Sequence, residues 1–179
     1  MLKSKKIVMT GLLTAVIIIS GFIKIPMYPV PVSALFLTVN FIALTFSRKI
    51  SFLSILIYLC VGLAGVPVFA GGGGIGYVLS PSFGYIIGFI LICIYNDELK
   101  KINVFNNNLF FKKLLLSIIN MFVIYLFGSL HGYIILGFYL KSPIDIYYIL
   151  LYYVGIFIPG DLLASVLSSY ISKRLNFVD

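Results

Sequence analysis

Long apolar runs alternate with short polar, proline-rich or glycine-rich breaks along the whole chain. Runs of about 17 to 25 apolar residues are typical of helices that cross a lipid bilayer. We therefore expect an all-α integral membrane protein in which residues 1–179 form one transmembrane domain. The apolar runs predict six transmembrane helices, at approximately residues 7–23, 32–46, 50–66, 82–95, 114–136 and 159–173.

The fifth apolar run, Leu114–Leu140, is too long for one upright crossing, so it must tilt, break near Gly132 or emerge from the bilayer. The residues after it, Ser142–Asp145, have the features of a helix start: a serine cap, then a proline, then an acid in the first turn. They predict an outer interfacial helix at about residues 143–155, whose tyrosines suit the membrane surface.

Two breaks between the predicted helices differ from solvated loops. In the first, Ile25–Ser33, three prolines exclude a helix and impose an extended backbone. The second lies within Ala64–Phe89 and contains Gly71–Gly74, with no Lys, Arg, Asp or Glu in the whole stretch. Glycine tolerates positive φ and close approach, so its amides can line a ligand surface. A flexible connector and a ligand-binding loop are both compatible with this segment.

The composition indicates the class of protein, and the positions of the basic residues indicate its orientation in the membrane. Hydrophobic residues make up 61% of the chain and charged residues 10%, and the mean hydropathy is +1.15, which excludes an ordinary soluble domain. The net charge of +8 does not indicate nucleic-acid binding, because most basic residues flank alternate breaks instead of sharing one face. Since cytoplasmic loops carry the excess of Lys and Arg, we expect a multi-pass protein of the cytoplasmic membrane with both termini inside and the glycines outside.

Asp161 is the only acidic residue inside an apolar run, where it follows Pro159 and Gly160 at the start of the last predicted helix. An ionisable group at membrane depth costs at least about 2.5 kcal/mol on insertion scales and usually faces a cavity or a partner. Two interpretations are open: a cap on the first helical turn, or an acceptor for the donor groups of a ligand in an outward-facing cavity. Asn40 raises a similar choice, between a hydrogen bond to another helix and a ligand contact.

The sequence offers little for catalysis. An aspartyl intramembrane protease needs two carboxylates in its spans and a metal centre needs several ligands, whereas this chain has one such Asp, one His and two separated Cys. The glycine run lacks the Lys and Ser or Thr of a phosphate-binding loop, so the chain itself is not expected to hydrolyse ATP. His131 is expected to be a hydrogen-bonded packing residue. We therefore expect no enzyme, no metal and no cofactor.

Three segments resemble the BioY family: IPMYPVPVS at Ile25–Ser33, GLAGVPVFAGGGGIGYVLSPSFGYIIGF at Gly62–Phe89, and IFIPGDLLAS at Ile156–Ser165. Members of that family are the biotin-binding S components of energy-coupling factor (ECF) transporters. The resemblance keeps the same order over nearly the whole chain. It implies a six-helix protein with an outward-open biotin site, capped by the first and third connecting loops.

The resemblance also implies a substrate, partners and residue roles. The chain would capture biotin, and a transmembrane scaffold subunit with two ABC ATPases would energise its uptake. Gly11 and Ala15 resemble the small-xxx-small face on which that scaffold docks. Asp161 would accept hydrogen bonds from the ureido ring of biotin, and amides of the glycine run would bind its carboxylate. The predicted substrate-binding residues are Asp161, Tyr85, Ser82, Gly73, Gly74, Tyr77, Phe69 and Ser33.

The chain departs from the family pattern at three positions. Ala164 stands where the family has a lysine, Leu35 where it has a glutamine, and Phe83 where it has a glycine. Each change makes the expected pocket less polar or bulkier. Two alternatives therefore stay open: an S component for another small vitamin or precursor, and a membrane structural or assembly protein in which Asp161 is merely a cap.

Overall fold

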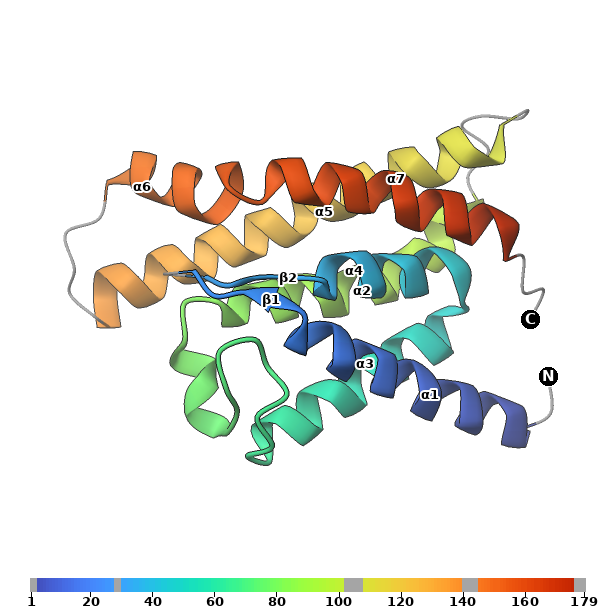
Figure 1. Cartoon of the computed structure of the whole chain (residues 1–179), viewed down its shortest axis with the longest axis horizontal. Coiled ribbons are helices and arrows are strands. Elements are labelled where there is room, and N and C mark those ends of the chain that lie inside the picture. Colours follow the sequence, from blue (N-terminus) through green and yellow to red (C-terminus); the bar gives the residue numbers. More distant parts are fainter. Residues whose placement is uncertain (1–2, 28–29, 102–107, 140–144, 176–179) are drawn as a thin grey trace.

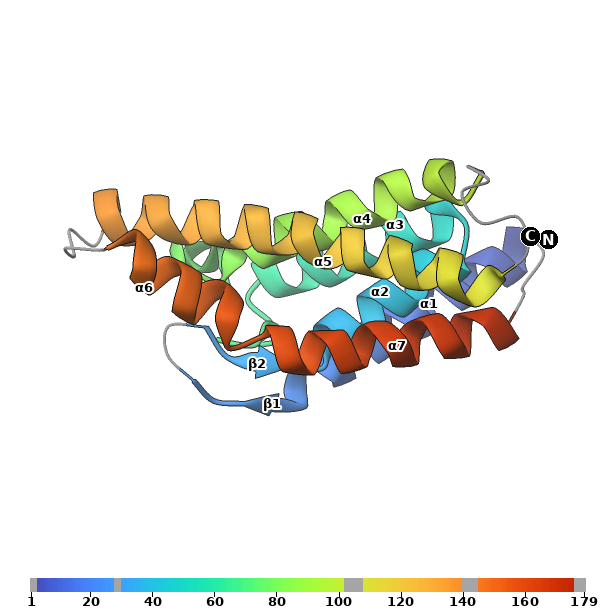
Figure 2. The same ribbon diagram turned by 90° about the horizontal axis from the view of Figure 1, so that it is seen from above.

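The structure, a computed structural model, describes residues 3–27, 30–101, 108–139 and 145–175. Most of these residues are helical, and the helices run roughly along the long axis of the molecule (Figures 1 and 2). The main elements are α1 Lys3–Phe22, β1 Lys24–Ile25, β2 Val32–Ser33, α2 Leu35–Thr45, α3 Arg48–Leu63, α4 Phe83–Lys101, α5 Leu109–Ile134, α6 Ile146–Leu150 and α7 Ile158–Arg174. Shorter pieces are a 3₁₀ helix at Ile75–Leu79 and π-helical turns at Ile135–Tyr139 and Leu151–Gly155.

Three of the described helical stretches are long and apolar enough to cross a membrane: Ser4–Phe22, Leu109–Tyr139 and Ile146–Arg174. The second of them contains the long fifth apolar run as far as Tyr139. It does not break near Gly132, because α5 continues directly into its π-helical turn. A Cβ atom at Gly132 would lie 2.2 Å from the ring of Tyr153, so this glycine is needed for close packing and not for a break.

Two helix ends differ from the predicted ones for local reasons. α3 ends at Leu63, ahead of Pro67, because Gly65 adopts a φ of 106° and its amide bonds back to the carbonyl of Gly62. α4 continues beyond Tyr95 to Lys101, since its last turns are polar and charged but still helical, with ion pairs between residues three apart. The segment between α3 and α4, residues 64–82, is called the glycine loop below.

The chain from α6 to α7 forms one helical column of 29 residues, Ile146–Arg174. The predicted cap Ser142 and the following Pro143 lie outside the described residues, and α6 begins after Asp145. The predicted interfacial helix and the predicted last span are therefore consecutive parts of one column. This column packs along α5 (Figure 1).

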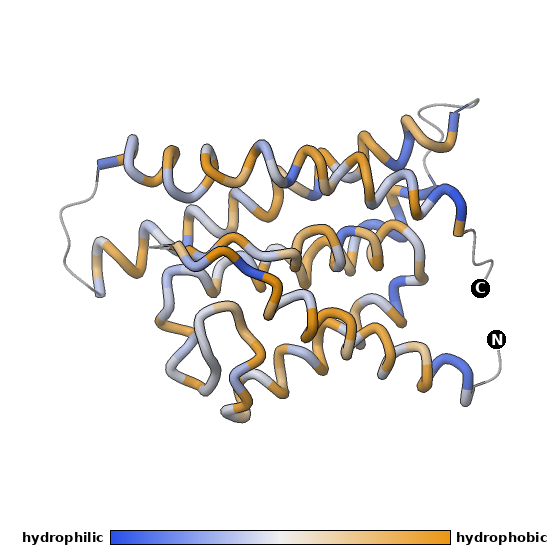
Figure 3. The backbone as a smooth tube through the Cα atoms, in the orientation of Figure 1, coloured by the Kyte–Doolittle hydropathy of each residue, from blue (hydrophilic) through white to orange (hydrophobic). Residues whose placement is uncertain are grey.

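The proline-rich segment forms a short hairpin in which Lys24 pairs with Ser33 and Ile25 with Val32. The ammonium group of Lys24 donates a hydrogen bond to the carbonyl of Ala70, which ties the hairpin to the glycine loop. Hairpin and glycine loop occupy one half of the molecule, and both chain ends lie at the opposite end (Figure 1). Hydrophilic residues gather toward the chain ends (Figure 3).

A buried group of polar side chains joins four helices in the half that carries the chain ends. The Asn40 amide nitrogen donates to the hydroxyls of Ser117 (2.5 Å) and Ser168 (2.7 Å), and its oxygen accepts from Asn120 (2.7 Å). The oxygen of Asn120 accepts in turn from Asn96 (2.9 Å). We call these five residues the polar network. They place Asn40 in hydrogen bonds between helices, which was one of its two predicted roles.

Lysines near this end bind the carbonyl ends of neighbouring helices. Lys100 donates to the carbonyl of Phe46, the residue that ends α2, at 2.7 Å. Lys113 is only 8% exposed and donates to both the carbonyl and the hydroxyl of Ser172 in the last turn of α7. A cation is favourable there because the carbonyls of a last turn are unpaired and carry partial negative charge.

Candidate functional site

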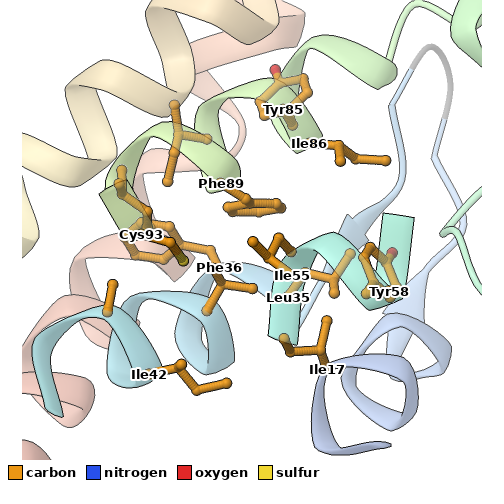
Figure 4. Packing of buried hydrophobic residues seen from close by; sticks show 14 of the residues in the cluster. Ile17, Leu35, Phe36, Ile42, Ile55, Tyr58, Tyr85, Ile86, Phe89 and Cys93 are labelled. Atoms are coloured by element: carbon orange, nitrogen blue, oxygen red, sulfur yellow. The ribbon is translucent and has the colours of Figure 1, made fainter. Parts of the chain in front are cut away.

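A hollow lies between the hairpin, the glycine loop and the helices α2, α3, α4, α5 and α7. It encloses about 540 Å³ of space between atoms, open mouth included. The wall residues labelled in Figure 4 are Leu35 and Phe36 of α2, Tyr58 of α3, and Tyr85, Ile86 and Phe89 of α4. The hollow is thus mostly apolar, and its size is within the range of small-molecule pockets.

Asp161 is the one ionisable carboxylate among the described residues that line the hollow. It lies in the first turn of α7, which Pro159 helps to start. The N-cap position belongs to Phe157, so the carboxylate does not occupy it. Its Oδ2 instead accepts a hydrogen bond of 2.8 Å from the hydroxyl of Tyr125 on α5. A carboxylate at a cavity wall with one oxygen bonded can offer its other oxygen to donors of a ligand.

Tyr85 presents its ring to the hollow from the first turn of α4. Its hydroxyl donates to the carbonyl of Tyr153 at 2.6 Å, and the two rings stack at an interplanar angle of 17°. Gly128 on α5 makes room for it, because a Cβ there would lie 2.7 Å from the Tyr85 ring. The ring of Phe157 lies 5.7 Å away on the same side. Tyr85 is therefore a rigid aromatic wall whose hydroxyl is already bonded.

Tyr77 and Ser82 bring polar groups from the glycine loop to the hollow. Their hydroxyls lie 2.8 Å apart, and that of Ser82 is 2.9 Å from the hydroxyl of Ser80. The Tyr77 hydroxyl also accepts from the amide of Gly71 at 3.3 Å. This chain of hydroxyls can turn donors or acceptors toward a ligand, since each O–H rotates.

Phe69, Gly73 and Gly74, also predicted as substrate contacts, do not line the hollow. Phe69 is 2% exposed, and its ring fills the space that a Cβ at Gly62 would need. A Cβ at Gly73 would lie 2.3 Å from the carbonyl oxygen of Val66, so glycine is required there for backbone packing. These three residues shape the glycine loop without being part of the cavity lining.

The amides of the glycine run differ from the predicted carboxylate-binding surface. Gly72 donates to the carbonyl of Phe69 at 3.0 Å, and Gly74, with a φ of 95°, donates to the carbonyl of Gly62 at 2.7 Å. With the Gly71 amide bonded to Tyr77, three of the four predicted donors are already bonded, two within the loop and one to the end of α3. The sequence pattern indicated positive φ correctly, but it could not indicate which acceptor each amide would meet.

Ser33 of β2 lines the hollow, as do Val30 and Pro31 from the same hairpin. The predicted docking residues Gly11 and Ala15 lie elsewhere, on an exposed face of α1. A Cβ at Gly11 would meet no atom within 4 Å among the described residues. The structure thus separates the predicted docking face from the predicted binding residues.

The three departures from the family pattern lie in different surroundings. Leu35 lines the hollow. Ala164 is buried and lies away from the lining. Phe83 packs between Tyr77 and His131, with ring centroids 6.4 Å and 5.8 Å away. Of the three, only the change at Leu35 reduces the polarity of the wall directly.

Outside the hollow, His131 contacts the backbone of the glycine loop. A ring nitrogen of His131 lies 3.2 Å from the carbonyl of Val78, which agrees with a packing role. No group of three or more His, Cys, Asp and Glu side chains suitable for a metal occurs among the described residues.

Sequence reasoning missed Tyr125 and most of the apolar wall. The missed wall residues are Val30, Pro31, Phe36, Tyr58, Ala70, Ile86, Phe89, Ile124 and Phe157. A partial signal existed on α4, where Tyr85, Ile86 and Phe89 have the spacing of one helix face. For Tyr125 there was none, because an aromatic residue in an apolar run looks the same whether it faces lipid or another helix.

The sequence profile of the BioY family matches residues 1–178. A probable biotin transporter BioY of Lysinibacillus sphaericus is 42% identical over 85 residues, which are 48% of this chain and 43% of that protein. The biotin transporter BioY of Thermotoga maritima is 34% identical over 88 residues, 49% of this chain and 52% of the relative. In these matches the chain spans about half the length of the relatives. A biotin transporter BioY of Lactococcus lactis subsp. cremoris is 31% identical over 183 residues, covering 97% of this chain and 92% of that one.

The fold is also similar to a solved structure, the 2.1 Å crystal structure of the S-component for biotin from an ECF-type ABC transporter. The two chains are 29% identical with a TM-score of 0.77, and the match covers 97% of this chain and 91% of the other. Fold and site together define an all-helical, multi-pass membrane protein with a mostly apolar hollow. The chain belongs to the BioY family.

Proposed function

We propose that this chain is the substrate-capture subunit for biotin uptake across the cytoplasmic membrane, energised by a separate ABC-type ATPase module. It is a transport protein and not an enzyme. Its similarity to the S-component for biotin over 97% of the chain supports the role, and so do the names of its relatives. The carboxylate of Asp161 at the wall of an apolar hollow is the single observation that carries the choice of ligand.

The chemistry of biotin suits this hollow in two respects. Its ureido ring has two N–H donors, and Asp161 is the acceptor on the wall. Its fused thioether ring is apolar and suits the faces of Tyr85 and Phe89. Because the amides of Gly71, Gly72 and Gly74 are already bonded to other residues of the protein, we assign the biotin carboxylate to the hydroxyl groups of Tyr77, Ser82 and Ser33.

The proposed topology has six crossings, made by α1, α2, α3, α4, α5 and the column from α6 to α7. Both termini then lie in the cytoplasm and the hollow opens outward. The common location of the chain ends supports this orientation (Figure 1), as does the gathering of hydrophilic residues toward them (Figure 3). Most lysines lie on the side of the chain ends, as expected if this side is cytoplasmic, because cytoplasmic loops carry an excess of Lys and Arg.

The proposed partners are a transmembrane scaffold subunit and two ABC ATPases. The exposed face of α1 around Gly11 and Ala15 is the proposed docking surface. Small residues let a partner helix approach closely in the membrane, where packing and not the hydrophobic effect drives association. An outward hollow and a lateral docking face can act at the same time because different elements form them.

Thermal unfolding of the purified protein in detergent tests the ligand. At 100 times its Kd, a ligand adds about 2.7 kcal/mol of stability to a binding protein. We expect biotin and desthiobiotin to raise the melting temperature and other vitamins not to. A shift with another vitamin alone would reassign the substrate, and no shift with any member of the panel would exclude a binding protein.

The variant Asp161→Asn tests the site. We expect its Kd for biotin to rise about tenfold or more, because a charged acceptor is replaced by a neutral amide. Isothermal titration measures the change. An unchanged Kd would remove Asp161 from the binding site and leave the choice of biotin as the ligand without its main structural support.

A further inference from the structure

We propose that Tyr125 is a positioning residue, which holds the Asp161 carboxylate in the orientation that receives the N–H groups of the ligand. The inference rests on the proposed function, because it concerns the same cavity. Its basis is a contact between two helices: the hydroxyl of Tyr125 on α5 donates to Oδ2 of Asp161 on α7 at 2.8 Å. Tyr125 is 4% exposed and is absent from the cavity lining, so it acts through Asp161.

The neighbours of Asp161 on its own helix offer no substitute for this donor. The residue three positions later, Ala164, has no hydrogen-bonding side chain. The residue four positions later, Ser165, has a buried hydroxyl that finds no partner among the described residues, Asp161 included. Support for the carboxylate therefore comes across the helix interface, from Tyr125.

Two consecutive residues of α5 face different surroundings. Ile124 lines the hollow, while Tyr125 lies toward α7. α5 thus forms part of the cavity wall and, one residue later, supports the acid on the adjacent wall. Because successive positions on a helix point about 100° apart, one helix can serve both purposes.

The bond has a consequence for ligand recognition. A hydrogen bond from a phenol to a carboxylate is charge-assisted and stronger than one between neutral groups. It restricts the rotation of the Asp161 side chain and uses one acceptor position of Oδ2, which leaves Oδ1 and the second acceptor position of Oδ2 for the ligand. A pre-oriented acceptor loses less conformational freedom on binding, so the affinity for a ligand with paired N–H donors rises.

A double-mutant cycle tests the proposal on the full-length protein in detergent, with biotin as the probe. Tyr125→Phe removes one oxygen atom and retains the ring. We expect it to raise the Kd for biotin about tenfold in the wild-type background. In the Asp161→Asn background the same substitution should change the Kd less than about twofold, because the hydroxyl then has no carboxylate to orient.

Tyr95→Phe is the matched control. The Tyr95 hydroxyl also donates at 2.8 Å to a side-chain oxygen, that of Asn120, but within the polar network. We expect both single variants to lower the melting temperature of the unliganded protein slightly, and only Tyr125→Phe to weaken biotin binding. Tyr125→Gln, which retains a side-chain donor, should recover part of the affinity and covers the case in which the phenylalanine variant does not fold.

The outcomes separate this inference from the proposed function. If the wild type binds biotin and Asp161→Asn does not, but Tyr125→Phe binds as the wild type does, the positioning role is overturned and the function stands. Equal losses from Tyr125→Phe in both backgrounds overturn it as well, since the two residues would then act independently. If the wild type itself does not bind biotin, the proposed function and this inference fail together.

Discussion

Asn40 in the polar network and Asp161 at the cavity are both polar residues inside apolar helices, yet their surroundings differ. The Asn40 side chain bonds to Ser117, Ser168 and Asn120, so both its nitrogen and its oxygen are engaged inside the protein. Asp161 accepts one bond from Tyr125 and lies at the wall of a hollow. The first arrangement holds helices together, and the second leaves an acceptor for a ligand.

Asn40 and Asp161 are both rare polar residues in membrane helices, yet rarity does not reveal which role each has. A buried amide can satisfy itself with neighbours of similar size, and the result is a fixed helix register. A carboxylate needs donors, and among the described residues the cavity half supplies it with Tyr125. The number of partners that the tertiary structure provides decides whether a polar group is structural or available for binding.

Asn40→Leu is expected to cause the largest loss of stability, which would sharpen the contrast between Asn40 and Asp161. It removes one hydrogen-bond partner from a buried asparagine amide and from each of two buried serine hydroxyls, so the free energy of unfolding should fall by about 2–3 kcal/mol. The Kd for biotin should stay within about twofold, because Asn40 does not line the hollow. Unfolding in mixed micelles and isothermal titration measure the two quantities.

Asn108→Ala is the control for this substitution, since Asn108 accepts one exposed capping bond from the amide of Phe110 at 3.2 Å. We expect a loss of at most about 1 kcal/mol. A strong loss of biotin affinity in a stably folded Asn40→Leu variant would contradict the division between the two halves.

A smaller effect is expected for Lys113→Met. The substitution retains much of the buried stem but removes the cation from the carbonyl end of α7, so stability should fall by about 1–2 kcal/mol. The control is Lys101→Met, because Lys101 forms an exposed ion pair with Glu98 that should contribute little. If both variants are equally stable in thermal unfolding, the contact between Lys113 and Ser172 does not contribute to stability.

The smallest effect, a faster release of biotin, is expected for Lys24→Met. This substitution removes the hydrogen bond between the hairpin and the glycine loop. Both segments line the hollow, so their connection should slow the escape of a bound ligand. We expect biotin to dissociate about two- to fivefold faster, which corresponds to one exposed hydrogen bond, while the melting temperature changes little. Stopped-flow displacement measures the rate, with the exposed Lys49→Met as the control. An unchanged rate would show that the two loops open independently of this bond.

Much of the fold was readable from local properties of the sequence. The helical segments, the proline-rich extended segment and the start of α7 at Pro159 follow from runs of apolar residues and from the fixed φ of proline. The predicted helix ends were less accurate: α3 stops at Leu63 because Gly65, not Pro67, provides the turn. Competing local signals a few residues apart cannot be ranked without their hydrogen bonds.

The candidate site was readable only in part. Asp161, Tyr85, Ser82, Tyr77 and Ser33 were predicted and do line the hollow, whereas Phe69, Gly73 and Gly74 are not part of its lining. Position in a motif indicates which segment forms the site, but it does not indicate which side of the segment faces the ligand. That choice depends on packing against other elements, such as the close contact of Gly73 with Val66.

By itself the sequence determined that this protein is a bundle of apolar helices with one acid inside them, because hydropathy and charge belong to each segment alone. Only the tertiary structure decided what that acid meets. Tyr125 and Asp161 are 36 residues apart in the chain, and no local pattern connects them. Their contact arises because α5 and α7 pack side by side, and packing is a property of the whole chain.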